Sequence, residues 1–178
     1  MKERVILESD QFNLVIKRLC CELIENHNDF LSTVIIGLQP RGIFLANRIH
    51  QILTEHYKLD VKNGTIDATF FRDDFRRNEN PLIPNSTKLD FALEGKRVIL
   101  IDDVLYTGRT IRAGMDAMLA FGRPAKVELL VLIDRQFGRH VPIQPDYTGL
   151  KVDTIEEQRV NVQWQESDGK DKVILFTS

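Results

Sequence analysis

Residues 98–110 read Val-Ile-Leu-Ile-Asp-Asp-Val-Leu-Tyr-Thr-Gly-Arg-Thr. The four apolar residues are typical of a buried parallel strand, and a short turn leads from the acidic pair into a helical pattern. In an open α/β sheet, ligands bind beyond the carboxyl ends of the strands, and backbone N–H groups at a helix N-terminus suit a phosphate. The pattern therefore predicts a phosphosugar site, in which Asp102 and Asp103 offer oxygens to ribose hydroxyls and a magnesium ion.

The composition is that of one globular domain. The chain has 178 residues, 43% of them hydrophobic, which is enough for one sizeable core and short for two, so we expect a single domain over residues 1–178. A net charge of −2 gives no whole-chain reason to expect nucleic acid or an anionic membrane as a partner. No apolar run approaches the roughly 20 residues of a membrane span, and no signal peptide is evident, which predicts a cytoplasmic protein.

The cysteines and histidines show no metal-binding spacing. Cys20 and Cys21 are adjacent, which excludes a disulfide framework, and we expect them to be structural thiols. None of the histidines is a candidate base. They are scattered along the chain, and we expect surface or edge positions for all four: His27, His50, His56 and His140.

Strand and helix patterns lie on both sides of the central motif. Ser9 can cap a helix whose apolar residues recur at three- and four-residue spacing from Phe12 to Ile24. Further elements are predicted at residues 33–37 and 126–134 (buried strands), 43–53 (a helix), 64–72 (a strand ending in Arg72), and 159–164 with 172–176 (a hairpin).

The central motif resembles the phosphoribosyl pyrophosphate (PRPP) motif of the type I phosphoribosyltransferases. An Asp-Asp pair alone also occurs in receiver domains, metal-binding hydrolases and ordinary strand exits, but the whole motif in its strand-turn-helix context is far more specific. Its continuation, Ile-Arg-Ala-Gly-Met-Asp-Ala at residues 111–117, resembles one member group, the bifunctional pyrimidine operon regulatory protein/uracil phosphoribosyltransferases. The resemblance implies an open, mostly parallel α/β sheet with helices on both faces, a small hood and a mobile flap.

The resemblance also implies a reaction, uracil plus PRPP giving UMP and pyrophosphate, with Mg²⁺ as cofactor. Asp102 and Asp103 are then catalytic together with Arg41, and both acids face the metal, through water and PRPP. Residues 107–110 hold the 5′-phosphate. The loop Gly-Leu-Gln-Pro-Arg-Gly at residues 37–42, which alone would be a tight turn, holds pyrophosphate. The implied PRPP-binding residues are Gln39, Pro40, Arg41, Gly42, Arg72, Val104, Leu105, Tyr106, Thr107, Gly108, Arg109 and Thr110.

The proposed flap is residues 72–88. This segment is rich in charge, Asn and Pro and shows no periodicity, which by itself is typical of a linker or a disordered loop. The resemblance implies instead a loop that closes over the active site and excludes water.

Base recognition rests on three residues. Arg135 follows a buried strand, and we expect it in the same cluster as Arg41 and Arg72. In the resembled family a Lys-Val pair meets the nucleobase through its backbone, which implies this role for Lys151 and Val152. The following Thr-Ile-Glu-Glu-Gln at residues 154–158 differs from the sequence that the resembled family has at these positions.

Two other functions remain open: an RNA-binding attenuator with secondary catalysis, and a purine (hypoxanthine or guanine) phosphoribosyltransferase, since pocket walls set the choice of base. The resemblance implies a homo-oligomer and a messenger RNA leader hairpin as partners. Lys17 and Arg18 are the candidate RNA contacts, but Cys21 and Glu25 follow them on the same side of the helix. We therefore predict weak RNA binding.

Overall fold

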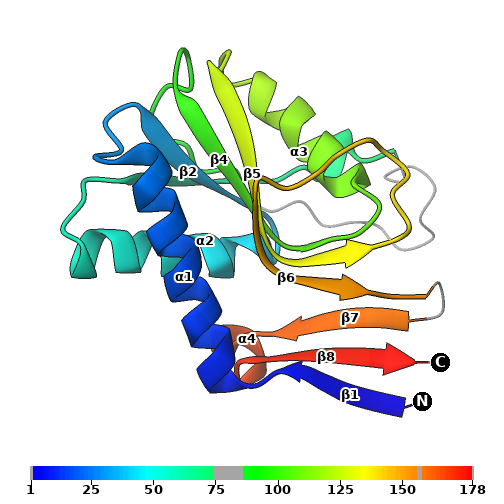
Figure 1. The fold of residues 1–178 in the computed structure, drawn as a ribbon. Coiled ribbons are helices and arrows are strands. Elements are labelled where there is room, and N and C mark those ends of the chain that lie inside the picture. The colour runs from blue at the N-terminus through cyan, green and yellow to red at the C-terminus, as the bar shows by residue number, and fades with distance from the viewer. Residues whose placement is uncertain (1, 74–85, 156–157, 178) are drawn as a thin grey trace.

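A computed structural model describes residues 2–73, 86–155 and 158–177 of the chain. Its centre is a parallel sheet with the strand order β3-β2-β4-β5-β6, which confirms the predicted α/β fold (Figure 1). The strands are β2 (Thr33–Leu38), β3 (Lys62–Ile66), β4 (Arg97–Leu105), β5 (Lys126–Gln136) and β6 (Tyr147–Asp153).

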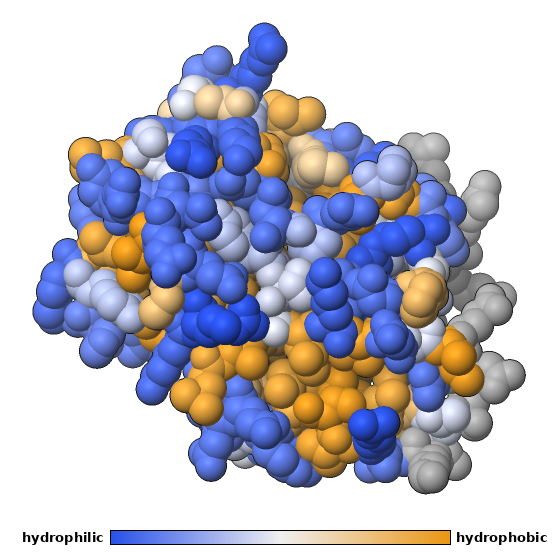
Figure 2. Space-filling model, in the orientation of Figure 1, coloured by the Kyte–Doolittle hydropathy of each residue, from blue (hydrophilic) through white to orange (hydrophobic). Residues whose placement is uncertain are grey.

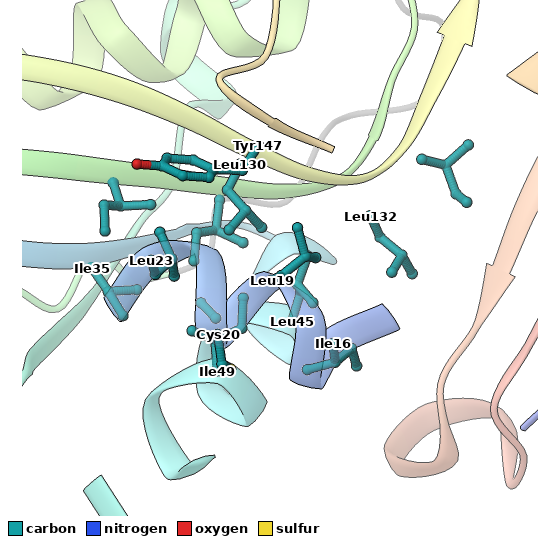
Figure 3. Packing of buried hydrophobic residues seen from close by; sticks show 14 of the residues in the cluster. Ile16, Leu19, Cys20, Leu23, Ile35, Leu45, Ile49, Leu130, Leu132 and Tyr147 are labelled. Carbon is teal, nitrogen blue, oxygen red and sulfur yellow. The ribbon is translucent and has the colours of Figure 1, made fainter. Parts of the chain in front are cut away.

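Helices cover both faces of this sheet, as predicted. α1 (Ser9–His27) and α2 (Gly42–Gln51), which a π-helical turn continues over Ile52–His56, pack on one face. α3 (Arg109–Leu119) packs on the other. Figure 3 shows the core of the first face, where apolar residues of α1 and α2 meet side chains of the strands: Ile16, Leu19, Cys20, Leu23, Leu45, Ile49, Ile35, Leu130, Leu132 and Tyr147.

A second, antiparallel sheet has the order β1-β8-β7. The predicted hairpin is confirmed as the last two of its strands, and the N-terminal strand pairs with it from the far end of the chain (Figure 1). We call this sheet and the short helix α4 the hood. Its elements are β1 (Lys2–Leu7), β7 (Gln158–Gln163), α4 (Gln165–Asp168) and β8 (Lys172–Thr177).

Two local predictions are wrong. Ser9 does not cap the first helix, because the helix begins at Ser9 itself and the preceding Glu8 makes no side-chain cap bond. The strand predicted at residues 64–72 ends at Ile66, and a 3₁₀ turn follows over Thr69–Phe71. The Asp67 carboxylate accepts a bond of 2.9 Å from the Thr69 backbone N–H, and this local turn competes with continuation of the strand.

The prediction of four surface or edge histidines is wrong for His27. Its side chain is fully buried, with Nδ1 3.0 Å from Thr33 Oγ1 and Nε2 2.8 Å from Glu128 Oε2. Nε2 also lies 3.2 Å from the Tyr147 hydroxyl. Burial lowers the pKa of His27, and Glu128 opposes that shift. A polar network therefore lies buried where β2 and β5 begin, far along the strands from the predicted site.

Candidate active site

The two acids lie near the carboxyl end of the central strand β4, and both are buried. The Asp102 Oδ1 atom accepts a bond of 2.9 Å from the Asp103 backbone N–H. Burial raises the pKa of Asp102 well above its usual range, and repulsion from Asp103 adds to the shift. Burial also raises the pKa of Asp103, but the Arg41 guanidinium opposes this. A buried acidic pair at this point suits a site where positive charge develops on a ligand.

Arg41, from the loop after β2, contacts one of these acids. Its Nε donates to Asp103 Oδ2 at 3.2 Å. Its NH2 group donates to the Val162 carbonyl and lies 3.4 Å from Asp168 Oδ2, both in the hood. One guanidinium thus joins the acidic pair to the hood. Because the side chain is partly exposed, an incoming anion can compete for the same fork.

Gly42 shows why the loop lies so close to β4. A Cβ atom at this position would lie 2.4 Å from the Ile101 carbonyl oxygen and 2.8 Å from Asp102 Cα. Real Cβ atoms do not approach backbone so closely, so only glycine allows this contact. The family resemblance predicts that Gly42 belongs to the diphosphate-binding loop at residues 37–42. In the structure it also determines how near that loop lies to Asp102.

The turn between β4 and α3 combines a left-handed glycine with a helix N-terminus, two features that suit phosphate binding. Gly108 has a φ of 85°, in the left-handed region that favours glycine, and forms the N-cap of α3. The backbone N–H groups of His140 and Val141 donate to the Thr107 carbonyl at 2.9 and 3.2 Å. The turn is therefore held in place by the loop after β5, with a helix N-terminus beside it.

Other members of the predicted PRPP set have different surroundings. The Leu105 side chain is part of the core, so only its backbone could meet a ligand. The Gln39 side chain donates to the Ser86 carbonyl at 2.7 Å, and the exposed Arg109 pairs with Asp73. Arg72 follows the 3₁₀ turn. Most of the proposed flap, residues 74–85, lies outside the described residues.

Arg135, which we expect in one cluster with Arg41, makes contacts with other residues. It is buried, and its guanidinium lies 3.6 Å from the centre of the Tyr106 ring. It donates to Thr154 Oγ1 at 3.3 Å and to the Gln158 carbonyl at 2.7 Å. A long side chain at the end of β5 can turn toward β4 or toward β6. The stacking on Tyr106 and the two acceptors fix the direction of the Arg135 side chain.

The remaining base candidates lie near Arg135. Lys151 is exposed, and with Arg135 it lines a cavity of about 660 Å³ beside the loop after β5. The Val152 side chain is buried in the core, so only its backbone is available, as the predicted role requires. Neither acid of the pair lines this cavity. The structure thus places the base candidates in one group and the acidic pair with Arg41 in another, with Tyr106 in contact with the first group.

The predicted RNA contacts lie on the outer side of α1. The Arg18 guanidinium is already occupied, since it donates to Glu22 at 2.8 Å and to the carbonyls of Thr148 and Gly149 at 3.2 and 2.5 Å. Lys17 is exposed. Figure 2 shows that hydrophilic residues cover much of α1 on this face, but they include acids as well as bases.

Sequence reasoning missed two residues that attach the hood near the site. Arg48 of α2 pairs with Glu166 and Asp171 through bonds of 2.7 to 2.9 Å, and its guanidinium lies 5.1 Å from the centre of the Trp164 ring. A lone arginine on the apolar side of a helix was a usable signal for Arg48. Trp164 is the only tryptophan of the chain, but its position in the sequence gives no sign that its ring packs against Phe12 and Phe44.

Comparisons with known proteins show similarities in sequence and in fold. The family described as the phosphoribosyl transferase domain matches residues 5–167. The chain is 43% identical to the bifunctional protein PyrR of Desulfosudis oleivorans, over 99% of this chain and 97% of the relative. It is 45% identical to the PyrR of Microcystis aeruginosa, over 96% of each.

Solved structures show the same fold at low identity. A hypoxanthine-guanine phosphoribosyltransferase of Bacillus anthracis superposes with a TM-score of 0.72 at 18% identity, over 98% of each chain. The hypoxanthine phosphoribosyltransferase of Trypanosoma cruzi also gives 0.72, at 15% identity, over 98% of this chain and 96% of that one. At such identity the likeness concerns the fold alone. With the family match and the two relatives above, it follows that the chain belongs to the phosphoribosyl transferase family, in the group of the bifunctional PyrR proteins.

Proposed function

We propose that this chain transfers the phosphoribosyl group of PRPP to uracil, with release of pyrophosphate, as a single domain over residues 1–178. The observation that carries the proposal is the contact between Arg41 and Asp103, 3.2 Å long, beside a phosphate-type turn at the start of α3. It brings together the two parts that the reaction needs, a cation for the leaving diphosphate and carboxylates for the sugar.

The reaction breaks a C1–O bond through a sugar with cationic character, so charge stabilisation and positioning matter more than a strong base. Asp102 and Asp103 face the ribose and its developing charge, and the turn at residues 107–110 binds the 5′-phosphate. Arg41 leaves Asp103 to bind the diphosphate, because a planar fork matches two of its oxygens better than one carboxylate oxygen. Because the acids are buried, water screens their interaction with the sugar cation less than it would at an exposed site.

The two acids supply only part of the ligands that a magnesium ion needs. Among the described residues no three His, Cys, Asp or Glu side chains form a metal cluster, so protein ligands alone do not complete a site there. Mg²⁺ prefers oxygen ligands and keeps several waters, and it is commonly held by one or two carboxylates plus substrate phosphates. Asp102 and Asp103 would hold it in this way with PRPP, where it would neutralise charge on the departing diphosphate.

A panel of five bases tests the choice of substrate. Purified protein is incubated with PRPP, Mg²⁺ and uracil, cytosine, hypoxanthine, guanine or xanthine, and pyrophosphate release is measured. We expect release with uracil alone. Release with hypoxanthine or guanine instead would identify a purine enzyme, and the fold likeness to such enzymes would then extend to their activity.

RNA binding is the second function, in keeping with the name of the relatives, which calls them bifunctional. The basic surface on α1 is thin because Arg18 already donates to three oxygens of its own chain, and each phosphate contact adds to affinity. RNA binding is therefore weak at physiological salt. Gel shifts with a pyrimidine leader hairpin, with and without UMP, measure it.

Self-association and location complete the proposal. An apolar area lies over the hood on the face shown in Figure 2, and an exposed area of this kind marks an interaction surface. We assign it to a second copy of the chain, which light scattering on the purified protein tests. Among the described residues no helix could span a membrane. A cytoplasmic location is part of the proposal, and cell fractionation tests it.

A further inference from the structure

Arg139 lies in the loop after β5, beside the turn that we assign to the 5′-phosphate of PRPP. All three nitrogens of its guanidinium meet acceptors of its own chain. Nε donates to the Ile143 carbonyl at 3.2 Å, and NH1 donates to the Arg135 carbonyl at 2.9 Å and to the Tyr106 carbonyl. NH2 pairs with the Asp134 carboxylate. One side chain thus closes this loop on itself and attaches it to the turn after β4.

The charge of Arg139 is balanced within the protein. Asp134 is buried, and its second carboxylate oxygen accepts a bond of 2.6 Å from the Gln136 side chain. The Arg139 side chain is itself only 24% exposed. Because a buried carboxylate without its arginine is strongly unfavourable, this guanidinium is not free to turn to an incoming phosphate. Its bonds serve the chain itself, whereas Arg41 presents a more exposed fork to the ligand.

The carbonyl that Arg139 holds also sets the direction of the next backbone N–H. In a planar trans peptide the C=O and N–H bonds point in opposite directions. Because the Tyr106 carbonyl faces Arg139, the Thr107 N–H points away from the loop after β5. The Thr107 carbonyl accepts two bonds, of 2.9 and 3.2 Å, from backbone N–H groups of that loop, so the Gly108 N–H also points away from it. Two successive N–H groups beside a left-handed residue, here Gly108, form a concavity that binds anions.

The Tyr106 ring strengthens this attachment. It lies 3.6 Å from the Arg135 guanidinium, measured to the ring centre. It also packs so close to Gly138 that a Cβ atom there would lie 2.6 Å from the ring atom Cε2. The turn is therefore held by the loop after β5 through both its backbone and a side chain.

We propose that Arg139 is a positioning residue for the 5′-phosphate of PRPP. Its fork holds the Tyr106 carbonyl so that the N–H groups of Thr107 and Gly108 face the phosphate, and Arg139 itself does not contact the ligand. The inference rests on the proposed transferase function, which gives the turn its ligand.

Two variants and two probes isolate this role. Arg139→Gln removes the charged fork, and Arg139→Lys keeps the charge but not the fork. Ribose 5-phosphate carries the phosphate that the turn binds, and pyrophosphate with Mg²⁺ carries the group assigned to Arg41. Calorimetry on the purified protein measures the affinity for each.

We expect both variants to bind ribose 5-phosphate at least about tenfold more weakly than wild type, because neither side chain reproduces a planar fork with several donors. Pyrophosphate affinity should stay within about twofold of wild type, because Arg41 and its loop are unchanged. In turnover, KM for PRPP should rise while kcat changes little, as expected when binding is lost equally from substrate and transition state.

Arg48→Gln is the matched control. It removes another guanidinium held by several bonds, but one that joins α2 to the hood. It should lower Tm, as Arg139→Gln does, and leave the affinity for ribose 5-phosphate within about twofold of wild type. An equal loss for both probes in Arg139→Gln would indicate general loosening, and wild-type affinity for ribose 5-phosphate in Arg139→Lys would indicate a role for charge alone. Either result would overturn the proposal.

NMR on the wild-type protein tests the same contact without a variant. We expect ribose 5-phosphate to shift the amide signals of Thr107 and Gly108 and to leave the Arg139 Nε–H signal in place. A large shift of the Nε–H signal would mean that Arg139 itself binds the phosphate, against the proposal. A wild-type protein that is inactive with every base would reject the proposed function, but ribose 5-phosphate binding and its loss in the Arg139 variants would still support the positioning role.

Discussion

Gly42→Ala tests whether the position of the diphosphate loop on β4 controls activity. The added Cβ would lie 2.4 Å from the Ile101 carbonyl oxygen, and ordinary contact begins at 3.4 Å. Neither the carbonyl nor the 2.8 Å contact at Asp102 Cα belongs to a flexible side chain. The loop must therefore move away from the strand by about 1 Å, and a displacement of that size at an active site costs on the order of 100-fold in rate.

Steady-state kinetics with uracil and PRPP measure this effect. We expect kcat/KM for PRPP to fall by roughly 30- to 300-fold, since Arg41 moves with the loop. Overpacking costs about 1–3 kcal/mol, so Tm should decrease by roughly 2–12 °C for a chain of this size. The variant should remain folded at the assay temperature, which circular dichroism checks.

Gly114→Ala is the matched control for the same chemical change. Its Cβ would meet only the end of the Leu38 side chain, at 2.8 Å, and that end can rotate. Alanine also favours the helix by about 1 kcal/mol relative to glycine, so we expect nearly wild-type activity and stability. If Gly42→Ala kept kcat/KM within about threefold of wild type, the loop would tolerate displacement, and the role assigned to its contact with β4 would be refuted.

Three more predictions address the acids, the buried histidine and the RNA surface. Asp103→Asn should lower kcat at least about tenfold with an unchanged circular dichroism spectrum; near-wild-type kinetics would remove the acid from the mechanism. Because burial lowers the pKa of His27, the unfolded chain binds more protons than the folded one below the usual histidine pKa, so stability should fall as pH decreases from about 7.5 to about 5.5. Urea unfolding should show a smaller decrease in His27→Gln, and an equal decrease would assign the effect elsewhere. Lys17→Ala should weaken RNA binding with no effect on turnover, whereas nanomolar, UMP-stimulated binding by this variant would place the RNA surface elsewhere.

Local signals were enough to predict much of the fold. The apolar run of β4, the acids at its end and the glycine turn before α3 are contiguous, so short-range rules describe them, and the family resemblance adds the sheet and the diphosphate loop. The same holds for the terminal hairpin, whose two strands are close in sequence. Where a local rule failed, at the strand predicted to reach Arg72, another local interaction, the Asp67 turn, was the cause.

The tertiary structure alone decided which side chains meet. Arg41 contacts Asp103 across 62 positions and Val162 across 121, and no periodicity or motif encodes such pairs. Arg135 lies near a strand exit, as the sequence predicts, but no local rule predicts that it stacks on Tyr106. The sequence predicts a surface or edge position for His27, but in the folded protein this side chain is buried beside Glu128 of β5. The backbone pattern follows from neighbours in the chain, whereas the direction of a long or polar side chain follows from partners that only the folded sheet and hood bring within reach.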